Sequence, residues 1–179
     1  MSNYENAFSI TVGNEGNYSN NPNDSGGETK YGITEKVARE NGYYGPMIDM
    51  PLSFAHKVYK SEYWDKLNLD SISNISTNVA NEMFDTGVNM GIVEAGKILQ
   101  RCLNVLNNMG SIYPDITLDG VIGQQTINAL TKYINYRKSD STLYVMMNCL
   151  QGSYYVDLAE KREKDETFIY GWFSKRVKI

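Results

Sequence analysis

The feature that most constrains the fold is a continuous apolar face in residues 92–106. Its members recur at three- and four-residue spacing: Ile92, Ala95, Leu99, Cys102, Leu103 and Leu106. That spacing places side chains on one side of an α-helix. Residues 14–31, in contrast, are rich in Asn, Ser, Gly, Asp and Pro, which favour turns. The sequence therefore predicts a mainly α bundle with a short irregular or β-hairpin segment near the N-terminus.

Capping and stop residues predict where the other helices begin and end. We expect a first helix from Tyr4 that ends between Gly13 and Gly16, a second capped by Thr34 and stopped at Gly42, and a third capped by Ser53. The next helices are expected at residues 79–91, with interruptions at Gly87 and Gly91, and in the segment that contains Thr126. A final short helix is expected near 171–173. Between these last two, a long helix is expected over 143–163, with these residues buried: Met146, Met147, Leu150, Tyr154 and Leu158. No internal repeat or low-complexity tract is present.

Charge and hydropathy exclude several classes of function. The net charge is -4 and the pI is about 5.1, so there is no excess of basic residues for nucleic acid or an anionic membrane. The longest apolar runs are far shorter than the roughly 20 residues that span a bilayer. The first residues lack the pattern of a signal peptide. We expect a soluble monomer that is made in the cytoplasm without a signal peptide.

The few metal-binding and redox residues argue against a cofactor. Cys102 and Cys149 lie in apolar helical patterns, so we interpret them as reduced core residues. A single histidine, His56, excludes any site with two His ligands, and its place beside an apolar stripe indicates a partly exposed structural residue. Residues 115–120 imitate the start of a calcium loop, but Thr126 replaces the bidentate Glu. We expect neither metal nor cofactor.

Glu15 is the candidate for acid chemistry. At 3.6 residues per turn it lies in register with Tyr4 and Phe8, so a helix that reached it would carry a carboxyl group on its apolar face. Desolvation there would raise the pKa, and the group could then hold a proton near neutral pH. The alternative is an exposed Glu after a frayed helix end, and the helical geometry alone does not decide between the two.

The residues after Glu15 suit a sugar, whose hydroxyls need fixed polar partners and whose flat faces pack on aromatic rings. The polar candidates are Asn20, Asn21, Asn23, Asp24, Ser25, Thr29 and Tyr31. The rings could come from Tyr18, Tyr31, Tyr43 and Tyr44, although tyrosines also occur at the rim of a core. Glycoside hydrolysis requires two carboxyl groups, and Asp24 is the nearest second one. Spacing does not choose between retention and inversion.

The same residues carry a family resemblance. Residues 15–18, Glu-Gly-Asn-Tyr, and residues 20–34 resemble the signature of the glycoside hydrolase family 108 N-acetylmuramidases, written EGGY followed by NDPxDPGGxTNYGIT. Further matches occur at 63–64, 84–91, 99–100, 119–126, 171–173 and 176–177. Three positions depart from the pattern, since Asn17 replaces a glycine, Ser25 replaces a proline and Lys30 stands where the family often has Asn. The resemblance spans nearly the whole chain.

This resemblance implies a lysozyme-like helical fold with Glu15 as the catalytic acid at the end of the first helix. Asp24 and Thr29 are candidates for stabilising the developing charge or holding water. The substrate-binding candidates are Tyr18, Asn21, Lys30 and Tyr31. Residues 1–94 are expected to form the catalytic lobe. Residues 95–179 resemble the family's predicted peptidoglycan-binding lobe, expected to pack against the first as one compact unit, with 119–126 as a structural turn and helix start.

The implied function is hydrolysis of the β-1,4 bond between N-acetylmuramic acid and N-acetylglucosamine. Members of the family are phage endolysins, which are bacteriolytic, and the muramidases called secretion activators. The enzyme would reach the wall or periplasm through a holin-type pore or another export route. Two alternatives stay open, a non-catalytic peptidoglycan-binding protein on the same fold and a general interaction protein with an acidic surface.

Overall fold

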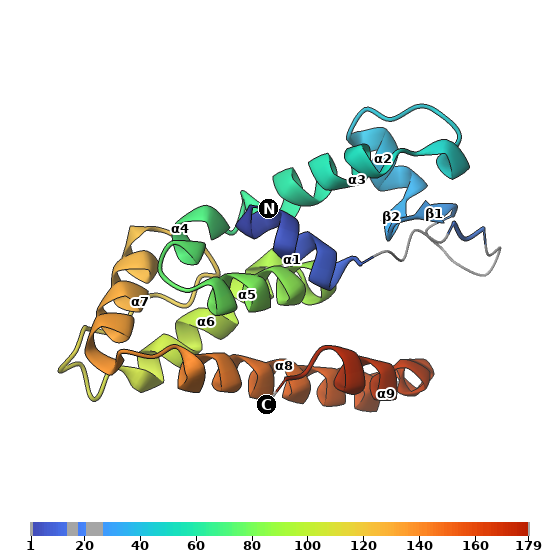
Figure 1. Ribbon diagram of the computed structural model, residues 1–179. Helices are drawn as coiled ribbons and strands as arrows, with labels where there is room; N and C mark the ends of the chain where they lie inside the picture. Colours follow the sequence, from blue (N-terminus) through green and yellow to red (C-terminus); the bar gives the residue numbers. More distant parts are fainter. Residues whose placement is uncertain (1, 14–17, 21–26, 179) are drawn as a thin grey trace. The chain divides into compact units, whose positions relative to one another are not determined.

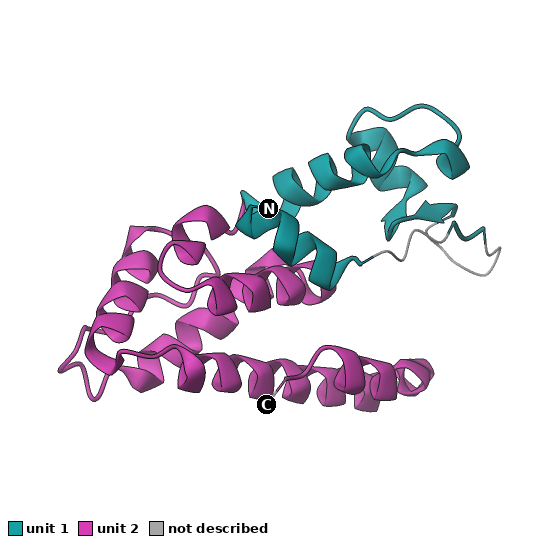
Figure 2. Cartoon of the chain, in the orientation of Figure 1, with its two compact units in different colours: residues 1–65 teal, residues 66–179 magenta. Residues whose placement is uncertain are grey.

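The computed structural model describes residues 2–13, 18–20 and 27–178. The chain divides into two compact units, residues 1–65 and residues 66–179 (Figure 2). The described residues are mostly helical, with one short antiparallel hairpin in the first unit (Figure 1). The expected mainly α fold with a hairpin near its N-terminus is confirmed. Three of the candidate site residues, Glu15, Asn21 and Asp24, lie outside the described residues.

The described residues of the first unit form three α-helices, two strands and two short helical segments of other types. In chain order these are α1 (Asn3–Thr11), β1 (Thr29–Lys30), β2 (Ile33–Thr34), α2 (Glu35–Glu40), the 3-10 helix η1 (Met47–Asp49), α3 (Leu52–Tyr59) and the π-helical segment η2 (Lys60–Trp64). A capping box between Ser2 and Glu5 begins α1. Thr34 caps α2 through the Val37 N–H, as expected.

Aromatic rings form the core of the first unit. Tyr4 and Phe8, one turn apart on α1, are both buried. The Tyr4 ring packs edge-on against Trp64 at 5.4 Å between centroids, and the Phe8 ring packs edge-on against Tyr59 at 5.5 Å. The imidazole of His56, which is half-buried, stacks on Phe8 at 3.7 Å. The expectation of a partly exposed structural histidine is confirmed.

The second unit is entirely helical in its regular structure. Its elements are α4 (Leu69–Ser73), α5 (Thr77–Met90), α6 (Ile92–Leu106), α7 (Gln124–Arg137), α8 (Ser141–Lys161), the 3-10 helix η3 (Glu163–Asp165) and α9 (Glu166–Lys175). Helix α6 begins and ends where its apolar face predicts. Gly91, with φ 92°, separates α5 from α6. The two helices pack against each other and against α8, and α9 packs on α8.

Residues 119–126 form the expected turn and helix start, held by a side chain of α6. The Gln100 Nε2 donates to the Asp119 Oδ1 at 2.9 Å and to the Val121 carbonyl at 3.0 Å, while its Oε1 accepts the Gly120 N–H at 2.8 Å. The Asp119 carboxylate also accepts the Val121 N–H at 2.8 Å. The segment resembles the start of a calcium loop because the same polar residues stabilise this turn by hydrogen bonds.

Two of the expected local signals are wrong. Ser53 does not cap α3, because the helix already begins at Leu52, with Pro51 as its N-cap. Gly87 does not interrupt α5, which continues to Met90. A Cβ at Gly87 would lie 2.8 Å from the Leu67 side chain, so this glycine permits close packing within the helix rather than a break.

The buried face of α8 is rotated from the expected one. Leu143, Met147, Gln151, Tyr155 and Ala159 are buried, whereas Met146, Leu150, Tyr154 and Leu158 are only half-buried. Cys102 is buried as expected, but Cys149 is exposed, so its interpretation as a core residue is wrong. The expected face followed the most apolar stripe, but polar Gln151 and Asn148 take part in the buried contacts instead.

The expected domain boundary between residues 94 and 95 lies within the second unit and stays a prediction. The structural division comes earlier, between Asp65 and Lys66. Among the described residues, no helix is both long enough and apolar enough to cross a membrane.

Candidate active site

A two-residue turn organises the candidate site in the first unit. Thr29 lies opposite Thr34 and Lys30 opposite Ile33 in the antiparallel pair of β1 and β2. The residues between the strands, Tyr31 and Gly32, have φ values of 52° and 75°. Positive φ at both central positions is the requirement of a type I′ turn, whose twist matches that of the strands it joins.

Tyr59 of α3 anchors this turn. Its O–H donates to the Tyr31 carbonyl at 3.0 Å. A Cβ at Gly32 would lie 2.6 Å from the Tyr59 hydroxyl oxygen, so the close approach requires glycine as much as the positive φ does. The Tyr59 ring in turn packs against Phe8 of α1 and stacks on Tyr63 at 5.5 Å. The aromatic core thus fixes the position of the hairpin.

Thr29 joins the hairpin to the segment that carries Tyr18. The Ser19 N–H donates to the Thr29 carbonyl at 2.9 Å, and the Thr29 N–H donates to the Ser19 carbonyl at 2.8 Å. Within the described residues, the Thr29 hydroxyl donates one long hydrogen bond, 3.5 Å, to the Gly27 carbonyl. Tyr18 and Thr29 are therefore held on adjacent backbone segments, and the Thr29 hydroxyl can readily exchange its weak partner for a ligand.

Glu28 is a carboxylate at this site that the sequence analysis did not single out. Partial desolvation, followed by the charge of Glu28 and a hydrogen bond to it, raises the pKa of Tyr18. The Glu28 side chain is half-buried, and its backbone carbonyl accepts the Glu35 N–H at 2.8 Å. Its position directly before Thr29 in the polar loop was the only available signal. The described part of the site therefore contains a carboxylate of its own.

Lys30 and Tyr31 interact with each other. The Lys30 ammonium lies 5.2 Å from the centroid of the Tyr31 ring and donates a hydrogen bond to the Ile48 carbonyl. An ammonium has three donors, so Lys30 retains capacity for a ligand. Both side chains are half-buried. Of the seven candidate residues, Thr29, Lys30 and Tyr31 lie on the hairpin, and Tyr18 lies on the segment that pairs with it through Ser19.

The helical register used to place Glu15 on an apolar face does not hold. Helix α1 ends at Thr11, Val12 is its C-cap, and Gly13 has φ 64°. A left-handed residue changes the direction of the chain, so the spacing from Tyr4 and Phe8 cannot be extended beyond it. The proposal that Glu15 is the catalytic acid therefore rests on the motif that surrounds it.

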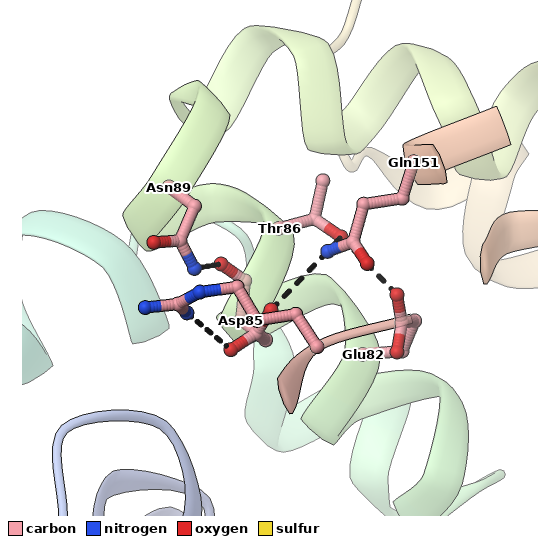
Figure 3. A network of polar contacts seen from close by, with 6 residues as sticks. Glu82, Asp85, Thr86, Asn89 and Gln151 are labelled. Carbon is pink, nitrogen blue, oxygen red and sulfur yellow. Dashed lines mark hydrogen bonds and ion pairs between the residues drawn. The ribbon is translucent and has the colours of Figure 1, made fainter. Parts of the chain in front are cut away.

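A second cluster of carboxyl groups lies in the second unit, between α5, α8 and the C-terminal segment (Figure 3). Asp85 accepts hydrogen bonds from Arg176 at 3.0 Å and from the Gln151 Nε2 at 3.2 Å. Gln151 also donates to the Thr86 hydroxyl, which donates to Glu82 at 3.4 Å. Burial, reinforced by the charge of Asp85, raises the pKa of Glu82 to about 7.

The burial of Glu82 decides against a catalytic role. The residue is 4% exposed, and its carboxyl group accepts a hydrogen bond from the Thr86 hydroxyl. A general acid must come within hydrogen-bond reach of the leaving oxygen. Asp85 instead forms an ion pair with Arg176 and so holds the end of the chain on α5. Among the described residues, no group of three or more His, Cys, Asp or Glu is placed to hold a metal ion.

Comparisons with known proteins match the chain in two segments. Residues 8–91 match the family model described as Glycosyl hydrolase 108, and residues 94–177 match the one described as Predicted Peptidoglycan domain. Among solved structures, that of Brucella abortus SagA is similar over 96% of this chain and 87% of that chain, with a TM-score of 0.68 and 23% sequence identity. At that identity the likeness shows the fold alone. A search of curated proteins gave no match.

Proposed function

Residues 8–91 belong to the glycosyl hydrolase 108 family, and on that premise we propose that the chain is an N-acetylmuramidase. The reaction is hydrolysis of the β-1,4 bond between N-acetylmuramic acid and N-acetylglucosamine in peptidoglycan, at the cell wall. The observation that carries the proposal is the glycosyl hydrolase match, which contains the Glu15 motif and the hairpin that follows it.

Glu15 is the proposed general acid. It protonates the bridging oxygen as positive charge develops on the sugar ring. Asp24 and Thr29 are proposed to stabilise that charge or to orient the attacking water. The rings of Tyr18 and Tyr31 and the polar groups of Asn21 and Lys30 are proposed to hold the sugar. Export or holin-dependent release is the proposed route to the wall, for an endolysin or a secretion activator.

The test compares Glu15→Gln with the control Glu40→Gln. Both exchanges remove one carboxylate, and Glu40 is an exposed residue of α2 with a single weak ion pair to Lys36 at 3.9 Å. We expect Glu15→Gln to lose at least about 100-fold in the release of reducing ends from purified sacculi, in line with the loss of a general acid. Glu40→Gln should remain close to the unmodified protein. Comparable activity of the two variants would refute the assignment.

Mass spectrometry of the products identifies the bond that is cleaved. A muramidase leaves reducing muramic acid ends, whereas a glucosaminidase leaves reducing glucosamine ends, an amidase frees peptides and a lytic transglycosylase leaves anhydro ends. Binding to sacculi without any soluble product from the unmodified chain would instead establish the non-catalytic alternative.

A further inference from the structure

A cavity of about 240 Å³ lies in the second unit, between residues 113–116 and one face of α7. The residues that line it and matter for binding are Tyr113, Asp115, Ile116, Gln125, Asn128 and Lys132. All of them fall within the peptidoglycan-domain match. The cavity uses none of the candidate residues of the first unit.

Helix α6 fixes the loop wall of this cavity. The Asn104 Nδ2 donates to the Ile116 carbonyl at 2.8 Å, and the Ile116 N–H donates to the Asn104 Oδ1 at 2.9 Å. The Asn107 Nδ2 donates to the Asp115 Oδ1 at 2.6 Å. The Tyr113 O–H donates to a backbone carbonyl of α6 at 2.9 Å. Four bonds thus hold the loop in position, which lowers the entropy cost of binding a ligand there.

On the opposite wall, side chains of α7 present hydrogen-bond donors that are not paired within the described residues. Gln125, Asn128 and Lys132 are three and four residues apart, so α7 places them in one row. The Asn128 Oδ1 accepts from Gln124 at 2.9 Å, which leaves the Asn128 Nδ2 for another partner. Within residues 2–13, 18–20 and 27–178, no hydrogen bond or ion pair is formed by the side chains of Gln125 and Lys132. The row therefore offers two amides and one ammonium.

We infer that this cavity binds the free end of the peptidoglycan stem peptide, with its terminal carboxylate on Lys132 and its carbonyls on Gln125 and Asn128. The inference rests on the proposed function, because that function makes peptidoglycan the source of the peptide. An ammonium recognises a carboxylate by a charge-assisted hydrogen bond, and side-chain amides match peptide groups. Asp115, on the opposite wall, can accept a peptide N–H.

Shape and lining favour a peptide over a sugar. The one aromatic side chain of the cavity, Tyr113, is 3% exposed, so it offers no open face on which a sugar ring could stack. The volume is below the roughly 300–1,000 Å³ of pockets for drug-sized ligands, so it suits about two terminal residues. Apolar surface contributed by the half-buried Ile116 suits the methyl groups of alanine residues.

The test titrates the isotope-labelled full chain with a soluble stem pentapeptide and follows amide NMR shifts. We expect shifts at residues 113–116 and 125–132. The same peptide with an amidated C-terminus should bind about tenfold more weakly, because it lacks the charge that Lys132 recognises. Lys132→Gln should weaken binding of the acid by a similar factor and no longer distinguish the acid from the amide. Lys161→Gln, an exposed charge at the end of α8, is the matched control.

Several results would overturn the inference. One is equal binding of acid and amide by the unmodified chain, and another is the absence of shifts at the cavity. A third is perturbation of the same residues by chitooligosaccharide but not by peptide. Hydrolysis of glycan strands stripped of their peptides tests the proposed function separately. If those strands stay intact while the peptide binds, the proposed function fails and the cavity assignment stands.

Discussion

At the scale of single residues, Glu82 couples the stability of the second unit to pH. Its raised pKa, about 7 against a usual value of 4.5, means that the folded state binds a proton more tightly than the unfolded state does. Between these two values the folded chain carries the proton and the unfolded chain does not, so stability falls as pH rises. Above about pH 7 both states are ionised and the dependence on pH ends.

Glu82→Gln is expected to remove this dependence, because the amide is neutral at every pH and keeps a similar shape. Between pH 5 and 7, the free energy of unfolding of the unmodified chain should fall with pH more steeply than that of the variant. The expected difference between the two slopes is about 1 kcal/mol per pH unit. Urea unfolding at pH 5, 6, 7 and 8 measures both slopes. The exposed Glu160, also changed to Gln, is the control and should keep the original slope. Parallel curves for the protein and Glu82→Gln would contradict the prediction.

Gln100 shows what single-residue patterns leave out. The sequence places it on α6 among apolar neighbours, and the family resemblance includes it, but its four polar contacts are with residues 19 to 26 positions away. Glu28 was missed for a similar reason, because the pairing of Ser19 with Thr29 determines which loop side chains meet. Residue type and local spacing indicate which groups can do chemistry, and long-range pairing decides which of them come together.

At the scale of elements, two helical glycines have opposite expected effects when changed to alanine. In an open helix, alanine is more favourable than glycine by about 1 kcal/mol. Gly171 of α9 has no atom within 4 Å of an added Cβ, so Gly171→Ala should stabilise by up to that amount. At Gly96 of α6 an added Cβ would lie 2.7 Å from the Gly120 carbonyl carbon, in backbone that cannot move aside cheaply.

Gly96→Ala should therefore destabilise by about 1 to 3 kcal/mol, the usual cost of overpacking, despite the better helix propensity. Chemical denaturation of the two variants and the unmodified chain measures the difference. Two stabilised variants would show that the 119–126 turn can move away from α6 at little cost.

The hairpin gives a prediction that links an element to activity. Tyr59→Phe removes the O–H that holds the Tyr31 carbonyl and should destabilise the protein by about 1 kcal/mol. If the hairpin helps to hold the sugar, the release of reducing ends from sacculi should also fall several-fold, because Tyr31 and Thr29 lose their fixed positions. Tyr170→Phe, at a tyrosine of α9 that is 84% exposed, is the control. Unchanged activity in Tyr59→Phe together with lower stability would separate the hairpin from catalysis.

The elements were predicted well where local chemistry determines them. The apolar face of α6, the Thr34 cap and the Gly91 break needed only neighbouring residues. The signals that failed, Ser53 and Gly87, depended on competing partners. The N-cap of α3 is Pro51, two residues before Ser53, and Leu67 fills the space at Gly87. The anchor of the hairpin, Tyr59, lies 28 residues from Tyr31, so no local pattern indicated it.

At the scale of the whole molecule, the boundary between the family matches and the boundary between the compact units differ. The glycosyl hydrolase match ends at residue 91, after α5, but the structural division lies at residue 65. Helix α5 packs against α6 and α8, which belong to the peptidoglycan-domain match. A division by sequence motif separates helices that share one core, so it does not reveal which segments fold together.

A chain truncated after residue 93 should therefore fail to fold α4 and α5. Met83 and Phe84 are fully buried in the intact protein, and exposing such side chains costs about 1.5 to 3 kcal/mol each. Asp85 would also lose Gln151 and Arg176, which leaves its carboxylate without those partners. We expect circular dichroism of residues 1–93 to show less helix than α1 to α5 contain, with rapid proteolysis after residue 65. A cooperative unfolding transition with full helical content would show instead that the glycosyl hydrolase segment folds without the helices that cover it, and that the motif boundary is also a folding boundary.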